Sequence, residues 1–217
     1  MRHRRTRIRP LVPRLNTRFT RVGAALLAVL AVFTLGRWSA PDATDPGLRL
    51  TAVEIGFAQD MSTHHDQVVL LASTLARDVT AQIRALADQM STAQTAEIAM
   101  MRGWLALFDL PRTAEQPMSW MTGTHQHTGG AAMPGMASTG EITRLAAARG
   151  ADAEVLFLQL MIRHHRGGVD MAQAAYAHAS NAQVRRTAME IVRQQVSELG
   201  VMTTLLTARE ADPLPYP

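Results

Sequence analysis

The sequence predicts an all-α protein in which four long helices form an antiparallel bundle of two helical hairpins. Apolar residues make up 47 % of the chain but aromatic residues only 5 %, and much of the apolar content is Ala, Leu and Met, which are strong helix formers. Long segments with helical patterning alternate with short polar turns, as expected when neighbouring helices are antiparallel. The two halves of the chain also repeat each other at a fixed spacing, which predicts that the hairpins arose by duplication.

The bundle is expected to occupy residues 50–209. Its first hairpin, residues 50–110, ends before Pro111, because proline lacks the amide hydrogen that a helix needs. In the second hairpin, residues 151–209, the side chain of Asp152 is expected to cap the first helix. The other parts are a polar linker (residues 38–49), a loop rich in Gly, Pro, Thr, Met and His (111–138), a short helix (139–150) and a tail (210–217).

The N-terminal segment, residues 1–37, predicts export from the cytoplasm. It holds nine of the 22 arginines and no acidic residue, and an uninterrupted apolar stretch covers residues 22–35. A basic segment followed by such an apolar core is typical of an export signal. The stretch is shorter than the roughly 20 residues of a spanning helix, so cleavage, retention as an apolar membrane-anchor helix and a soluble N-terminal helix all stay open. We expect the rest of the chain to be extracytoplasmic, either secreted or anchored to the membrane.

The basic net charge belongs to the same N-terminal segment. Without it, 13 basic residues stand against 18 acidic ones, a net charge of about −5. A nucleic-acid partner is therefore not expected. The chain has no cysteine, which excludes disulfides and thiolate metal ligands.

The repeat is clearest in two segments, "FAQDMSTHHDQ" from Phe57 and "FLQLMIRHHRG" from Phe157, each of which contains Met-x-x-His-His. Residue types recur 100 positions later for Phe57, Gln59, Met61, His64, His65 and Ala72. In the helices that follow, the spacing is 101, and the identities fall at Gln82, Arg84, Ala87, Gln94, Glu97 and Met101. An apolar stripe alone does not require identity at polar positions, so the repeat favours a duplicated functional device.

Each motif is expected to present imidazole and thioether groups to the bundle interior, because residues three and four apart share a helix face. The candidates are Met61, His64 and His65 in the first motif and Met161, His164 and His165 in the second. On the partner helices, amide, carboxylate and thioether groups share one face, at Gln94, Glu97 and Met101 and again at Gln195, Glu198 and Met202. The glutamates could bind a metal or could orient the histidines by hydrogen bonds. The methionines could instead simply fill the core.

Two adjacent glycines, Gly167 and Gly168, follow the second histidine pair inside a predicted helix. Each costs about 1 kcal/mol relative to alanine at such a position. Close packing of a neighbouring element and room for a ligand beside the histidines are both compatible with them.

The connecting loop holds a second group of candidate ligands in a segment with few other large apolar residues. They are Met118, Met121, His125, His127, Met133 and Met136. Thioether groups suit Cu(I), and imidazole groups also suit Cu(II). The alternative is a disordered linker that contains methionine by chance.

The motifs resemble the bacterial domain of unknown function 305 family, which includes CopM-like proteins. The resemblance rests on "FAQDMSTHHDQ", "MPGM", "FLQLMIRHHRGGVDMA" and "QVSELGVM", and it covers about residues 50–209. It implies a ferritin-like four-helix bundle that is exported, and for some members copper binding and copper resistance. The family pattern falls on Met61, His64, His65, Met133, Met136, Met161, His164, His165 and Met171.

The main hypothesis is therefore an extracytoplasmic metal-binding protein that sequesters or transfers copper in copper homeostasis or resistance. Copper is the expected ion, with another divalent metal as the alternative, and a metal-delivery protein is a possible partner. One rival is a ferritin-like, metal-dependent redox enzyme, although no Glu-x-x-His motif supports iron. A second rival is a metal-free module that responds to pH or binds a partner. No catalytic residue is predicted, and the two histidine pairs are expected to form two separate centres.

Overall fold

The computed structural model describes residues 49–121 and 133–216. Within these ranges the chain is all-helical, with five helices and no strands. The helices are α2 (Ala52–Thr74), α3 (Ala81–Leu107), α4 (Thr139–Ala147), α5 (Gly150–His178) and α6 (Ala182–Thr207). The predicted export or anchor segment lies outside the described residues, as do His125 and His127. None of the described helices is long and apolar enough to cross a lipid bilayer.

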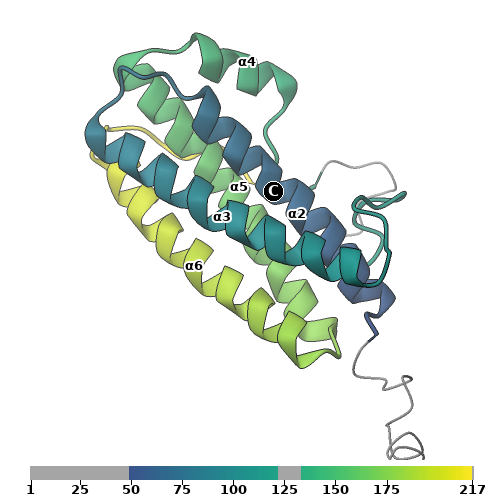
Figure 1. Cartoon of the computed structure of the whole chain (residues 1–217). Coiled ribbons are helices and arrows are strands. Elements are labelled where there is room, and N and C mark those ends of the chain that lie inside the picture. The colour runs from purple at the N-terminus through teal and green to yellow at the C-terminus, as the bar shows by residue number, and fades with distance from the viewer. Residues whose placement is uncertain (1–48, 122–132, 217) are drawn as a thin grey trace, which may run out of the picture. The chain divides into compact units, whose positions relative to one another are not determined.

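Four of these helices, α2, α3, α5 and α6, are long and lie side by side, and they are called the bundle below (Figure 1). The helices α2 and α3 pack together as one hairpin, and α5 and α6 as the other. The two hairpins meet chiefly along α2 and α5, and the short α4 contacts both of these helices. Any site shared by the hairpins is therefore expected along the contact between α2 and α5.

The helix starts follow local capping chemistry. At the start of α2, the Thr51 hydroxyl accepts a hydrogen bond from the Glu54 amide, and the Glu54 carboxylate accepts one from the Thr51 amide. A capping box of the same kind begins α4. The helix α5 starts at Gly150 and not at Asp152, because Gly150 adopts a φ of +51° that lets the chain turn directly from α4 into α5.

Two glutamates connect the hairpins, because each one caps the turn of the opposite hairpin. Glu54, in the first turn of α2, accepts hydrogen bonds from the amides of Ser180 at 2.9 Å and Asn181 at 2.6 Å, in the turn between α5 and α6. Glu154, 100 positions later in α5, accepts one from the amide of Thr80 at 2.6 Å, just before α3. Burial raises the pKa of both carboxyls, but these hydrogen bonds, together with the Arg209 guanidinium beside Glu154, outweigh it and hold the pKa of each below 4.5.

The repeat continues into the segments that follow α3 and α6. Two residues 101 positions apart adopt left-handed backbone conformations after the helix ends, Asp109 with a φ of +53° and Glu210 with a φ of +54°. The returning segments are then held by the side-chain amides of equivalent glutamines, which donate to backbone carbonyls, Gln59 to Pro111 at 2.8 Å and Gln159 to Asp212 at 2.7 Å. Each hairpin thus folds back over its own first helix in the same way.

The bundle interior is divided along its length into two apolar clusters separated by polar residues. One cluster joins the second half of α2 to the first half of α5 and includes Leu71 and Phe157. The other joins the first half of α2 to the second half of α5 and includes Phe57 and Ala175. Between the clusters, each helix of the bundle contributes two polar residues to what is called the polar layer: His64, His65, Gln94, Glu97, His164, His165, Gln195 and Glu198.

Candidate metal centre

The two inner histidines of the polar layer, His64 on α2 and His164 on α5, meet where the hairpins join. Their ring centroids are 3.8 Å apart and the rings are tilted by 34°. Nε2 of His64 donates to the backbone carbonyl of Pro134 at 3.0 Å, and Nε2 of His164 donates to the carbonyl of His64 at 3.0 Å. Both side chains are fully buried. The structure therefore brings one histidine of each pair into direct contact across the hairpin boundary.

The other two histidines, His65 and His165, face the partner helices of their own hairpins. Nε2 of His65 donates to the Glu97 carboxylate at 2.8 Å, and Nε2 of His165 donates to the Glu198 carboxylate at 2.7 Å. The imidazoles are fully buried, whereas 15 % of the Glu97 side chain and 7 % of the Glu198 side chain are exposed. In this structure the two glutamates therefore orient the histidines.

These hydrogen bonds determine which ring nitrogen carries the proton. Carbonyl and carboxylate oxygens accept these bonds, so Nε2 carries a proton in each ring, and in the neutral form of the ring Nδ1 keeps a free lone pair. All four Nδ1 atoms are buried, and none has a hydrogen-bond partner among the described residues. A histidine that binds a metal through one ring nitrogen typically donates a hydrogen bond from the other to a carbonyl or carboxylate. The polar layer thus offers four imidazole lone pairs that are already oriented.

The inner histidines are neutral at physiological pH. Burial, followed by the proximity of His65, lowers the pKa of His64 to about 3. Burial, followed by the proximity of His64, also lowers the pKa of His164 well below 6.5. Protons therefore do not compete for these two lone pairs near neutral pH, which is the state that metal binding requires.

The five bundle methionines that the sequence singled out are all fully buried and are divided between the two apolar clusters. Met61, Met101 and Met171 belong to one cluster. Met161 and Met202 belong to the other. Each apolar cluster thus brings the methionine of one motif together with the matching methionine of the partner helix. The methionines fill the core, and they also place thioether sulfur in the apolar clusters on either side of the polar layer.

Two glutamine side chains in the polar layer have no hydrogen-bond partner in the described part of the chain. Gln94 and Gln195 are each 1 % exposed, and both polar atoms of each amide are unsatisfied among the described residues. The Gln195 amide lies directly against Gly168, where a Cβ atom would overlap it. The repeat drew attention to these amides, but the sequence did not indicate that they would be buried without partners. Buried amides of this kind indicate an additional polar occupant of the layer.

The Met-Pro-Gly-Met segment, residues 133–136, covers the polar layer where α2 meets α5. A Cβ atom at Gly167 would overlap the Pro134 carbonyl, so this glycine permits the close approach that lets Pro134 accept from His64. The following backbone is held by Gln67, whose side-chain amide exchanges two hydrogen bonds with Ala137, at 2.9 and 2.6 Å. Gly167 and Gly168 are therefore explained by close packing and not by open space.

The loop candidates are only partly described. Met133 and Met136 are partly exposed and flank the Pro134 carbonyl in the chain. Met118 is buried in the apolar cluster that contains Met61, and Met121 is partly buried against the same cluster. Sequence reasoning did not identify Pro134 and Gln67 as neighbours of the site, because their contacts join residues about 70 positions apart.

The polar layer does not contain a complete metal site of nitrogen and oxygen ligands. In residues 49–121 and 133–216, no three His, Asp or Glu side chains converge closely enough to hold a metal ion. The unsatisfied groups that the layer does offer are imidazole nitrogens, with thioether sulfur in the adjoining apolar clusters. Imidazole and thioether ligands suit copper better than they suit Mg²⁺, Ca²⁺ or Mn²⁺, which prefer oxygen ligands.

Comparison with known proteins places the chain in a family. The family model "Domain of unknown function (DUF305)" matches residues 54–206. A DUF305 protein from Streptomyces coelicolor, assigned as secreted, has 36 % identity and a TM-score of 0.68, with coverage of 76 % of this chain and 96 % of that protein. A DUF305 fragment from Deinococcus radiodurans has 31 % identity and a TM-score of 0.62, with coverage of 73 % and 98 %.

A more distant likeness is to CopM. Its Cu(I)-bound form has 22 % identity and a TM-score of 0.56, and its Cu(II)-bound form has 24 % identity and a TM-score of 0.54. The alignments cover 71 % of this chain and 96 % of CopM. At this level of identity, the likeness shows that the two proteins share a fold. None of the curated proteins matches the chain.

Proposed function

Because the chain belongs to the DUF305 family, we propose that it is an extracytoplasmic protein that binds copper in its polar layer, in order to sequester or transfer the ion. The observation that carries the proposal is the set of four buried Nδ1 atoms that have no hydrogen-bond partner among the residues that the structure describes. CopM has been solved with Cu(I) and with Cu(II) bound, which supports copper over another divalent metal. The secreted assignment of the 36 % identical relative supports a place outside the cytoplasm.

In this proposal, His64, His65, His164 and His165 supply nitrogen through Nδ1, and the methionines beside the polar layer supply sulfur. Bound copper would contribute a soft, redox-active cation. The chain itself keeps the lone pairs oriented, because every Nε2 is fixed by a carbonyl or a carboxylate. It also excludes water, because all four imidazoles are fully buried. Glu97 and Glu198 accept hydrogen bonds from Nε2, which raises the basicity of the Nδ1 lone pair that would bind the metal.

The contact between His64 and His164 bears on the number of centres. Two separate centres were expected from the sequence. A ring separation of 3.8 Å instead favours one connected layer, in which an ion bound in one hairpin alters the other. We also infer a ferritin-like antiparallel four-helix bundle that arose by duplication, which the equivalent roles of Glu54 and Glu154 support.

The rival functions receive less support from the same residues. A carboxylate-rich redox centre would need Glu97 and Glu198 as ligands, and both are engaged with histidines. A pH-responsive module would need histidines that titrate near neutral pH, whereas His64 has a pKa of about 3. The N-terminal segment as a signal or membrane anchor, and a metal-delivery protein as a partner, remain parts of the proposal.

The proposal is tested by titrating the purified protein with Cu(I), Cu(II) and Zn(II) in the presence of a competing chelator. His→Gln variants at positions 64, 65, 164 and 165 are suited to this test, because the glutamine amide can replace the Nε2 donor while the Nδ1 lone pair is lost. We expect the four-fold variant to lose tight Cu(I) binding, whereas His178→Gln, an exposed residue at the end of α5, retains it. If the four-fold variant is folded and binds as much copper as the wild type, the polar layer is not the site.

A further inference from the structure

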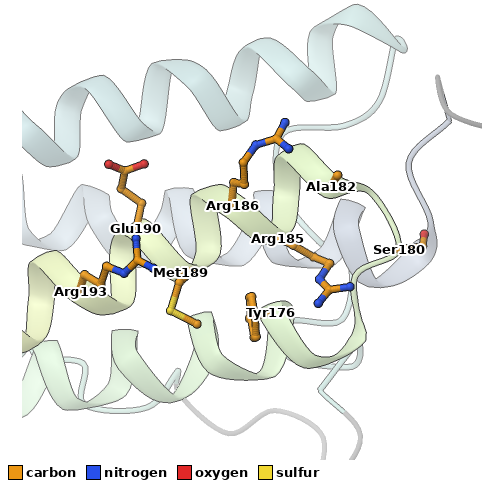
Figure 2. A pocket seen from close by; sticks show the side chains of 8 residues that line it. All are labelled: Tyr176, Ser180, Ala182, Arg185, Arg186, Met189, Glu190 and Arg193. Carbon is orange, nitrogen blue, oxygen red and sulfur yellow. The ribbon is translucent and has the colours of Figure 1, made fainter.

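An open pocket with a basic lining lies outside the polar layer, where α5 ends and α6 begins. It has a volume of about 460 Å³. Its lining residues are Tyr176, Ser180, Ala182, Arg185, Arg186, Met189, Glu190 and Arg193. Figure 2 shows Arg185 and Arg193 on either side of Tyr176 and Met189, while Arg186 and Glu190 extend from the other side of α6. Two guanidinium groups thus flank the tyrosine and the methionine, and a third lies on the other side of α6, in a chain that is acidic outside its N-terminal segment.

The arginines of this pocket are not paired with any carboxylate of the described residues. Four arginines elsewhere in the described residues do form such pairs, as Arg102 does with Asp66. Within residues 49–121 and 133–216, neither Arg185, Arg186 nor Arg193 forms an ion pair, although Arg186 donates a hydrogen bond to the side chain of Gln183 at 2.7 Å. The guanidinium carbon of Arg185 instead lies 5.1 Å from the centroid of the Tyr176 ring, a cation–π contact that leaves its N–H groups available.

The duplicated hairpin contains the equivalent pocket, which provides an internal comparison. That pocket lies between α2 and α3 and includes Arg84 and Asp88, the counterparts of Arg185 and Met189. Arg84 is fully engaged there, because its guanidinium caps the carbonyls at the end of α2. In the second hairpin four further positions differ, with Tyr176 for Ala76, Arg186 for Ala85, Glu190 for Gln89 and Arg193 for Thr92.

These substitutions replace a structural arginine site by an exposed basic pocket. Arg185 lies over the Tyr176 ring, and the carboxylate moves from the position of Met189 to Glu190, which extends from the other side of α6 (Figure 2). The bundle tolerates both versions, so the basic pocket is not required by the fold. Guanidinium groups held beside a tyrosine and a methionine form bidentate hydrogen bonds with carboxylates.

We propose that this pocket docks an acidic segment of a partner protein. Tyr, Met and Arg are the residue types enriched in protein–protein interfaces. The pocket is open and its lining is mostly exposed, which suits a peptide laid across α6 better than an enclosed metabolite. Glu190 at its edge can accept hydrogen bonds from a peptide backbone, whose N–H donors a phosphate polymer lacks. Three arginines are also fewer than the basic cluster that anionic membranes usually require.

The test measures binding of a fluorescein-labelled hexaglutamate peptide to the metal-free full chain by fluorescence anisotropy at low salt. The variant Arg186→Ala/Arg193→Thr installs the residues of the other hairpin at exposed positions, so the fold should be retained. We expect it to weaken binding at least about tenfold, since each charge-assisted hydrogen bond contributes roughly 1.5 kcal/mol or more. The control Arg112→Ala/Arg144→Ala removes the same charge elsewhere on the surface and should change affinity little.

Several results would overturn the proposal. These are an absence of peptide binding at low salt, and an equal loss in the test and control variants. Tighter arginine-dependent binding of inorganic phosphate, duplex DNA or phosphatidylglycerol vesicles than of the peptide would assign the pocket to another ligand. The measurement uses protein without metal, so it is independent of the copper proposal.

Discussion

Replacing Gly167 by alanine should destabilise the protein, although the same change stabilises most helices. Gly167 lies in the middle of α5, directly beneath the Pro134 carbonyl. A methyl group at this position cannot be accommodated unless the Met-Pro-Gly-Met segment moves away from the helix. That movement would break the hydrogen bond from His64 to Pro134, which is 3.0 Å long in the structure.

The size of the effect follows from three contributions. Overpacking of a close contact costs about 1–3 kcal/mol. Leaving the buried Nε2–H of His64 unpaired costs about 1–3 kcal/mol more. The higher helix propensity of alanine offsets about 1 kcal/mol. The net loss in the free energy of unfolding should be about 3 kcal/mol, or roughly 6–12 °C in Tm for a domain of this size.

The assay is urea or thermal unfolding of the metal-free protein, with Gly200→Ala as the matched control. Gly200 lies in α6, and no atom of residues 49–121 or 133–216 would contact a Cβ placed there. This control should therefore be more stable than wild type by up to about 1 kcal/mol. The reasoning is refuted if Gly167→Ala is as stable as wild type, or is stabilised to the same extent as the control.

The other predictions concern the capping glutamates and acid stability. Glu54→Gln and Glu154→Gln should each lower the free energy of unfolding by about 1–3 kcal/mol, because buried amide hydrogens lose charged acceptors; urea unfolding should show no comparable loss for the exposed control Glu115→Gln. Acid should destabilise the metal-free protein through His64, whose pKa is 6.5 when unfolded and about 3 when folded. Between these values only the unfolded chain takes up the proton, so stability should fall as pH falls, by up to about 1.4 kcal/mol per pH unit. His164 acts in the same direction. The prediction is contradicted if the free energy of unfolding stays constant between pH 7 and pH 4.

The helical class and the polar layer could be predicted because both are repeated in the sequence. Identity at Gln94, Glu97 and both histidine pairs at a fixed spacing indicated that these polar side chains share the interior. The division of roles within a pair also follows from helix geometry, since adjacent residues point about 100° apart. One histidine meets the opposite hairpin and the other meets a glutamate of its own hairpin.

The parts that could not be predicted depend on contacts between distant segments. Glu54 and Glu154 are also 100 positions apart, but the sequence did not show that each carboxylate would cap the turn of the other hairpin. Gly167 was compatible with two explanations until the position of Pro134 was known. The basic pocket was not predicted, because the repeat is recognised from identical residues, whereas the pocket depends on positions at which the two halves differ.

The protonation and metal response of the four polar-layer histidines test the central claim most directly. Long-range nitrogen-15 correlation spectra of histidine-labelled protein distinguish protonated from unprotonated ring nitrogens, and Cu(I) is diamagnetic and compatible with them. We predict that all four rings carry the proton on Nε2 at neutral pH and that Cu(I) shifts their Nδ1 resonances. Rings protonated on Nδ1, or Nδ1 resonances that Cu(I) leaves unchanged, would contradict the account.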